Sequence, residues 1–274
     1  MKTALSEVPL CDNDANSQSI PASCSPPQLG DQSTRAPSPK KPMLADRNRV
    51  SNESTSHPKG LPHQTHLSFC YTNAQGLRSK FSELVLRFQS SQWDIIAVTE
   101  TWLTNDILDS ELCLPGMSLL RRDHPTRGGG VLLYHQNDLQ CDAVDPPVSA
   151  PDTIWCKLKL SKHDDCLVGV VYHSPSSTES ANDTFVRAML QVLSAKFSHI
   201  LIVGDFNCPH LDQTLTSHLS FQSQFKQLID SHPLYNHMKE PTRFRNLATS
   251  SMDLVLTNEE LMVESIGLTP LRTQ

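Results

Sequence analysis

Polar residues stand at the exits of several apolar runs in this 274-residue chain. They are Asn73 after LSFCYT, Glu100 after DIIAVT, Tyr172 after LVGVV, Asp205 and Asn207 in LIVGDFN, and Asp253 within SSMDLVLTN. An unpaired carboxylate in an apolar environment costs several kcal/mol, so the repetition predicts a shared partner. A divalent cation together with a phosphate would supply that partner.

Each of these residues also has an ordinary structural explanation. Asn-Ala-Gln-Gly is typical turn chemistry, and TWLTND could start a helix. The alternatives are a turn at Asn73, a helix cap at Glu100, a rim aromatic at Tyr172, an Asx-turn at Asp205, and an ion pair of Asp253 with Arg243 or Arg245.

Histidines and a glycine run add further candidates. We expect His135, His173 and His210 to be solvated rather than metal ligands. The RGGG sequence at residues 127–130 would either cradle a phosphate through backbone N–H groups or form a bulge at the start of a strand.

Hydrophobic periodicity predicts the elements that must position these residues. Strands are expected over residues 67–73, 93–103, 127–136, 152–160, 165–175, 199–207 and 252–258. Helices are expected over residues 80–92, 179–198 and 221–232. The first helix should place Leu84, Leu86 and Phe88 on or near one face, and the second should align Phe185, Met189, Leu190 and Leu193. Strands with helices at the crossovers suit two packed sheets with helices outside.

Residues 1–62 have a different composition, rich in Ser, Pro, Asn, Asp and Lys. Apolar residues are too few there to offset the entropy of ordering the chain, so we predict a disordered tail followed by a domain over residues 63–274. Residues 64–274 carry 16 basic and 23 acidic side chains. An acidic body gives no general attraction to nucleic acid, so a polyanion would need a local patch or a metal ion.

Targeting signals and cysteine frameworks are not apparent. The eight cysteines form no CxxC pair, which favours reduced thiols that mostly pack in the interior. Glu7 and Asp12 interrupt any signal-peptide core, and no run approaches the roughly 20 apolar residues of a membrane span. We therefore expect a soluble, nuclear or cytoplasmic protein that is not secreted, with no membrane association and no stable protein partner.

In chain order these motifs form one pattern. Asn73, TETWL, RGGGVLLY, VYHSP, GDFN and EPTRFRNLATSSMDLVLTN resemble the endonuclease/exonuclease/phosphatase superfamily. Within it, they are most similar to the apurinic-type endonuclease domain of LINE-like (non-LTR) retrotransposons. The resemblance covers about residues 66–268.

The resemblance implies a fold and a reaction. The fold would be α/β (α+β), a four-layer α/β/β/α sandwich of two packed mixed sheets with outer helices. The reaction would be hydrolysis of DNA phosphodiesters with Mg²⁺, for which Mn²⁺ could substitute. Glu100 and Asn73 would hold the metal. Asp205, Asn207, Tyr172 and Asp253 would be catalytic, and Arg127, Thr242 and Ser251 would line the substrate side.

The chain departs from the family pattern at its end. The family closes with a strand ending in Ser-Asp-His, whose histidine is oriented by the residue that corresponds to Asp253. The present chain instead ends in VESIGLTPLRTQ. We therefore expect the last strand to be missing, a sheet edge to be unpaired and prone to association, and Asp253 to lack a partner. The activity should be weakened. The alternatives to a DNA-nicking enzyme are a phosphatase of small phosphoesters or inositol lipids, and a catalytically dead remnant.

Overall fold

The computed structural model describes most of the chain after residue 65. The described residues are 3–8, 66–126, 128–209, 211, 220–239, 243–245, 248–250 and 252–271. For residues 3–8, 243–245, 248–250 and 268–271 it places the backbone only. Most of the predicted tail, residues 9–62, therefore lies outside the described residues, as do Arg127, His210, Thr242 and Ser251.

Within the described residues, two six-stranded sheets and one small hairpin are formed. Sheet A has the order β14 (Gly267–Leu271), β1 (Thr3–Val8), β2 (Phe69–Asn73), β3 (Ile95–Thr99), β5 (Val131–Gln136), β4 (Met117–Arg122). Sheet B has the order β10 (Tyr235–Asn236), β13 (Asp253–Thr257), β9 (His199–Asp205), β8 (Asp164–Tyr172), β7 (Thr153–Ser161), β6 (Cys141–Ala143). The hairpin pairs β11 (Arg243–Arg245) with β12 (Ala248–Ser250).

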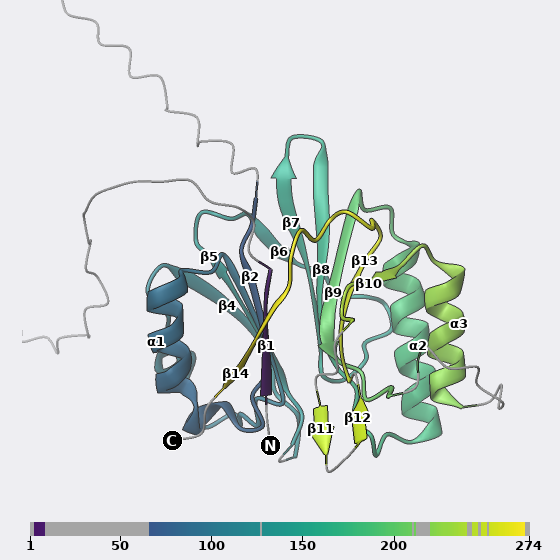
Figure 1. Cartoon of the computed structure of the whole chain (residues 1–274), viewed down its shortest axis with the longest axis horizontal. Coiled ribbons are helices and arrows are strands. Elements are labelled where there is room, and N and C mark those ends of the chain that lie inside the picture. The colour runs from purple at the N-terminus through teal and green to yellow at the C-terminus, as the bar shows by residue number, and fades with distance from the viewer. Residues whose placement is uncertain are drawn as a thin grey trace, which may run out of the picture. The chain divides into compact units, whose positions relative to one another are not determined.

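Helices cover the outer faces of both sheets (Figure 1). Helix α1 (Phe81–Ser91) lies on sheet A, and α2 (Glu179–Ser194) and α3 (Phe221–Ser231) lie on sheet B. Two short 3-10 helices are η1 (Leu77–Ser79) and η2 (Asp109–Leu112). A third cluster of buried side chains lies between the sheets, with members from β2 and β3 on one side and β8, β9 and β13 on the other. This order of layers is the predicted α/β/β/α sandwich.

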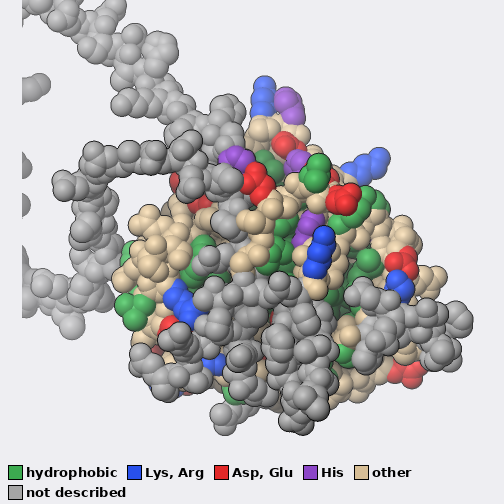
Figure 2. Space-filling model, viewed as in Figure 1, with side chains coloured by type: hydrophobic (Ala, Val, Ile, Leu, Met, Phe, Trp, Pro, Cys, Tyr) green, Lys and Arg blue, Asp and Glu red, His purple; other side chains and the backbone are tan. Residues whose placement is uncertain are grey.

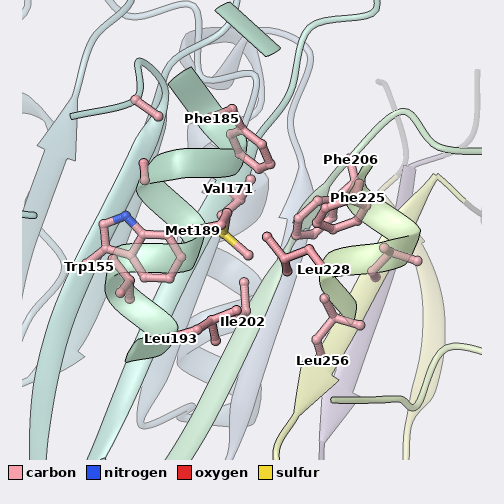
Figure 3. Packing of buried hydrophobic residues seen from close by; sticks show 14 of the residues in the cluster. Trp155, Val171, Phe185, Met189, Leu193, Ile202, Phe206, Phe225, Leu228 and Leu256 are labelled. Atoms are coloured by element: carbon pink, nitrogen blue, oxygen red, sulfur yellow. The ribbon is translucent and has the colours of Figure 1, made fainter. Parts of the chain in front are cut away.

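Aromatic packing anchors α2 and α3 to sheet B (Figure 3). Phe206 follows β9 directly, is fully buried, and stacks on Phe225 of α3 with ring centroids 4.9 Å apart. Phe185 of α2 meets Phe206 edge-on at 6.4 Å. Burying such a ring contributes roughly 1.5–3 kcal/mol. The residue between Asp205 and Asn207 therefore points into the core and fixes its two polar neighbours at the end of β9.

Local signals define the helix boundaries. Thr178 caps α2 by accepting from the Ala181 N–H, and Ser220 caps α3 by accepting from the Ser223 N–H. Helix α1 ends at Gln92, which has the left-handed φ of 49°. The residues predicted to form the apolar faces of α1 and α2 are buried only in part. Leu84 is buried, but Leu86 is 62% exposed, and Leu190 is also exposed.

Seven strands were not predicted, namely β1, β4, β6, β10, β11, β12 and β14. Two of them, β1 and β14, correct the expectation of an unpaired edge. Strand β1 pairs with β2 on one side and β14 on the other, so the edge of β2 is occupied and a strand does follow β13. Composition could not reveal β1, because six residues of mixed polarity are hidden in a polar segment. Pro270 is compatible with β14 because that strand lies at the edge of the sheet.

No helix among the described residues is long and apolar enough to cross a membrane.

Candidate active site

Strand pairing brings the predicted polar residues to one end of the two sheets. In sheet A, the parallel strands β2 and β3 end together, with Asn73 opposite Thr99 and Glu100 next in the chain. In sheet B, β9 lies between β8 and β13. Asp205 therefore stands opposite Tyr172 on one side and Asp253 on the other.

Close contact between β8 and β9 requires the glycine of the GDFN motif. A Cβ added at Gly204 would lie 1.8 Å from the carbonyl oxygen of Val171. No side chain fits at that distance. Glycine at this position lets β9 pair tightly enough to set Asp205 beside Tyr172.

Asn73 joins the two sheets. Its Nδ2 donates to Glu100 Oε1 and to Asp205 Oδ2, at 2.8 Å in each case. These two bonds use both amide protons, and the amide oxygen Oδ1 takes part in neither of them. Asn73 Oδ1 is buried and has no hydrogen-bond partner. Burying a carbonyl oxygen without a hydrogen-bond donor costs free energy, and a ligand bound at this oxygen would offset that cost.

The donor set fits a hard divalent cation. Magnesium prefers oxygen ligands and is commonly held by one or two carboxylates together with water and substrate oxygens. Asn73 Oδ1 and the half-buried Glu100 carboxylate supply such oxygens. Within the described part of the chain, no group of three or more His, Cys, Asp or Glu residues could enclose a metal by itself.

Asp205 and Asp253 form a buried carboxylate pair. They are 6% and 8% exposed and lie opposite each other on antiparallel strands. Burial raises the pKa of Asp205 well above its ordinary value, and the neighbouring charge of Asp253 adds to this. The Asn207 N–H, which donates to Asp205 Oδ1 at 3.0 Å, acts in the opposite direction. Asp205 is therefore suited to hold and release a proton.

Asp253 has a partner, contrary to expectation. The buried Tyr71 hydroxyl donates to Asp253 Oδ1 at 2.6 Å and lies 3.0 Å from Thr99 Oγ1. The pKa of Tyr71 is raised by burial and by the charges of Asp253 and Asp205, so the phenol stays neutral. The ion pairs considered for Asp253 involve Arg243 and Arg245, whose side chains are outside the description.

Tyr172 and Asn207 complete the end of sheet B. Burial raises the pKa of Tyr172, helped by the charges of Glu100 and Asp205, so its hydroxyl remains a hydrogen-bond donor. Asn207 has a left-handed φ of 49°, and its Nδ2 donates to the His173 carbonyl at 2.8 Å. The Asx-turn considered for Asp205 is present in the bond from the Asn207 N–H.

Two histidine predictions were wrong. His135 and His173 are buried rather than solvated, and His173 stacks on Phe221 with centroids 3.7 Å apart. The burial of His173 depends on tertiary packing against Phe221 of α3, and its Nε2 lies 2.8 Å from Asn182 Oδ1 of α2.

Sequence reasoning also missed Tyr71, His124 and Asp152. Tyr71 is an inward position of the alternating LSFCYTN run, and Asp152 heads the alternating DTIWCKLKL run. Those patterns predict burial, but only the tertiary structure shows which polar groups the two side chains meet.

Comparisons with known proteins agree with this architecture. A family model described as endonuclease–reverse transcriptase matches residues 166–271. The catalytic domain of APE2 from Xenopus laevis shares 18% identity at a TM-score of 0.55, over 71% of this chain and 82% of that one. The 3′ phosphatase NExo from Neisseria, solved with a product DNA hairpin, shares 14% identity at a TM-score of 0.54, over 70% and 86%.

A retrotransposon protein has the same fold. The endonuclease domain of TRAS1, a telomere-specific non-LTR retrotransposon, shares 13% identity at a TM-score of 0.52, over 71% of this chain and 86% of that one. A comparison with curated protein sequences gives no match. At these identities the solved structures establish the fold.

The fold agrees with the one that the sequence resemblance implied, and the family model covers the C-terminal part of the chain, residues 166–271. Its fold is shared with both nucleases and phosphatases, and the family model it matches is that of endonuclease–reverse transcriptases.

Proposed function

We propose that the chain is a Mg²⁺-dependent phosphodiesterase that nicks DNA and derives from a non-LTR retrotransposon. The observation that carries the proposal is the buried, unpartnered Oδ1 of Asn73, on a side chain that also bonds Glu100 and Asp205. Asn73 and Glu100 are the residues that would hold the cation. When bound, Mg²⁺ would polarise a phosphoryl oxygen and offset the negative charge of the transition state.

Protein groups perform the remaining steps. Asp205 takes a proton from the attacking water, which its raised pKa favours. The neutral Tyr172 hydroxyl donates to the scissile phosphate, and Asn207 hydrogen-bonds the phosphoryl oxygens as charge builds. Asp253, held by Tyr71, keeps a second negative charge beside Asp205. Arg127, Thr242 and Ser251 remain proposed substrate contacts.

DNA is favoured as the substrate by the matched family and by two relatives in fold, the retrotransposon endonuclease and the phosphatase solved with DNA. Charge gives no support, because residues 64–274 are acidic. On the face drawn in Figure 2, the coloured Lys and Arg side chains lie apart from one another rather than in a stripe. A phosphatase acting on small phosphoesters is therefore the second candidate.

Plasmid nicking tests the proposal. Supercoiled DNA and a small phosphomonoester are incubated with the full chain, in Mg²⁺, in Mn²⁺ and in excess EDTA. The expected result is conversion to open circles in the presence of metal only, with no release of phosphate. Phosphate release without nicking would favour the phosphatase, and inactivity toward both would favour a dead remnant. Asp205→Asn serves as the control for contaminating nuclease.

A further inference from the structure

We propose that Asp152 is a positioning residue of this site, one that holds Glu100 and Tyr172 in place through the glycine loop. The glycine loop is defined here as residues 128–130. Asp152 is not among the residues that the sequence pattern assigned to the site. The inference rests on the proposed function for its activity readout, but its structural basis is independent of it.

Asp152 is a buried carboxylate with two separate donors. Its Oδ1 accepts from the Gly130 N–H at 2.8 Å, and its Oδ2 accepts from His124 Nδ1 at 2.8 Å. The residue is 5% exposed, and its φ of 53° is left-handed. Asp and Asn adopt that conformation more readily than other side chains. Both the backbone conformation and the two acceptors therefore call for this residue type.

The glycine loop connects Asp152 to Glu100. The loop carbonyls accept from the two residues that follow the glutamate: Thr101 N–H donates to Gly130 at 3.2 Å, and Trp102 N–H donates to Gly129 at 3.1 Å. Glu100 itself has a left-handed φ of 49°. The conformation that presents its carboxylate is thus fixed from outside, by bonds to the glycine loop.

The same contacts explain two of the three glycines of the loop. A Cβ at Gly130 would lie 2.5 Å from Thr101 Oγ1, and a Cβ at Gly129 would lie 3.1 Å from both carboxylate oxygens of Asp152. Of the two sequence interpretations, a phosphate cradle could not use the N–H of Gly130. That N–H is already used by Asp152. The glycine loop connects Asp152 to the segment after Glu100 through hydrogen bonds to both.

Asp152 also fixes the other half of the site. Its carbonyl oxygen accepts from the Tyr172 N–H at 2.9 Å, at the end of β8. The side chain therefore holds the segment that carries Glu100, and the main chain holds the residue that contacts the phosphate. Misplacing a catalytic group by about 1 Å costs on the order of a hundredfold in rate, so this shared support has consequences for catalysis.

Two substitutions separate the backbone from the carboxylate. Asp152→Gly keeps the left-handed φ without strain and removes both acceptors. Asp152→Asn keeps the φ and one acceptor for Gly130. Asp165→Asn is the matched control, because Asp165 lies at the far end of the β7–β8 pair and its bond with Lys159 is only partly buried.

The experiment measures kcat for nicking, the Mg²⁺ concentration for half-maximal rate, and amide hydrogen exchange without metal in peptides covering residues 99–103. For Asp152→Gly we expect kcat to fall about a hundredfold. The Mg²⁺ requirement should rise and amide exchange at residues 101 and 102 should quicken, while circular dichroism stays unchanged. Asp152→Asn should be intermediate, and Asp165→Asn should match the parent.

Unchanged amide exchange at residues 101 and 102 in both Asp152 variants would overturn the inference, whether or not the parent nicks DNA. An active parent whose kcat and Mg²⁺ requirement survive Asp152→Gly would also overturn it. An inactive parent would instead refute the proposed function and leave amide exchange to decide the positioning role. If Asp152→Gly fails to fold, Asp152→Asn supplies the same readouts.

Discussion

Two pairs of polar side chains stand at the same end of the two sheets, and they are built differently. In sheet A, Asn73 and Glu100 follow parallel strands, the amide of Asn73 bonds the carboxylate at 2.8 Å, and Glu100 is only half-buried. In sheet B, Asp205 and Asp253 face each other on antiparallel strands, and both are buried. Burial and the second charge raise the pKa of Asp205.

The difference separates two chemical roles. An accessible carboxylate beside an unpartnered carbonyl oxygen offers ligands to a cation. Two buried carboxylates side by side disfavour double ionisation, which stabilises a proton on one of them. We therefore propose that sheet A supplies the metal-binding half of the site and sheet B the proton-transferring half, with Asn73 joining them.

The largest expected effect is on the nicking rate. Glu100→Gln and Asp205→Asn should each lower kcat by about a thousandfold, because the first removes a proposed metal ligand and the second removes the proposed base for the attacking water. Raising Mg²⁺ should restore part of the rate of Glu100→Gln, since the glutamine is a weaker ligand, and none of the rate of Asp205→Asn. If added Mg²⁺ restored the rate of Asp205→Asn but not that of Glu100→Gln, Asp205 would be assigned to metal binding and Glu100 to proton transfer.

The next effect concerns the backbone that places Asp205. Gly204→Ala should lower the free energy of unfolding by about 3 kcal/mol or more, because the added Cβ would lie 1.8 Å from the Val171 carbonyl oxygen. Gly116→Ala is the matched control. Gly116 has a φ of 78° but no atom within 4 Å of an added Cβ, so it should lose only about 1 kcal/mol. Equal losses in urea unfolding would mean that β9 can move away from β8 at little cost.

Much of this site was predictable because its residues follow recognisable strands. Apolar runs with polar exits predicted β2, β3, β8 and β9 and the side chains at their ends. The SSMDLVLTN run predicted β13, which begins at Asp253. Strand β1 and the Tyr71–Asp253 bond were not predictable, since each depends on a partner more than 60 residues away. The role of the RGGG run also stayed open. Its meaning depends on Asp152, which no local pattern connects to it.

A third test examines the metal-binding half without relying on activity. Saturating Mg²⁺ should stabilise the parent by about 1–3 kcal/mol, because a ligand that binds only the folded state adds its binding free energy. Glu100→Gln should lose most of that gain in thermal unfolding with and without Mg²⁺. Glu260→Gln, an exposed glutamate on the loop after β13, should keep it. The same gain in Glu100→Gln and in the parent would remove Glu100 from the metal site.

The smallest expected effect concerns the proton-transferring half, measured by urea unfolding in EDTA from about pH 4 to about pH 8. The pKa of Asp205 is raised in the folded state, so above the ordinary carboxyl pKa the folded protein binds a proton that the unfolded chain has released. Stability must then fall as the pH rises, until the raised pKa is passed. Asp253→Asn keeps an oxygen that accepts from Tyr71 but removes the neighbouring charge.

In that variant the pKa of Asp205 should move back toward its ordinary value, so the decline in stability should end at a lower pH. Burial, the larger cause of the shift, remains, so part of the decline should persist. Asp183→Asn, an exposed aspartate on α2, should follow the parent curve. If Asp253→Asn also follows the parent curve, the two carboxylates do not share a proton. The contrast between the halves would then rest on burial alone.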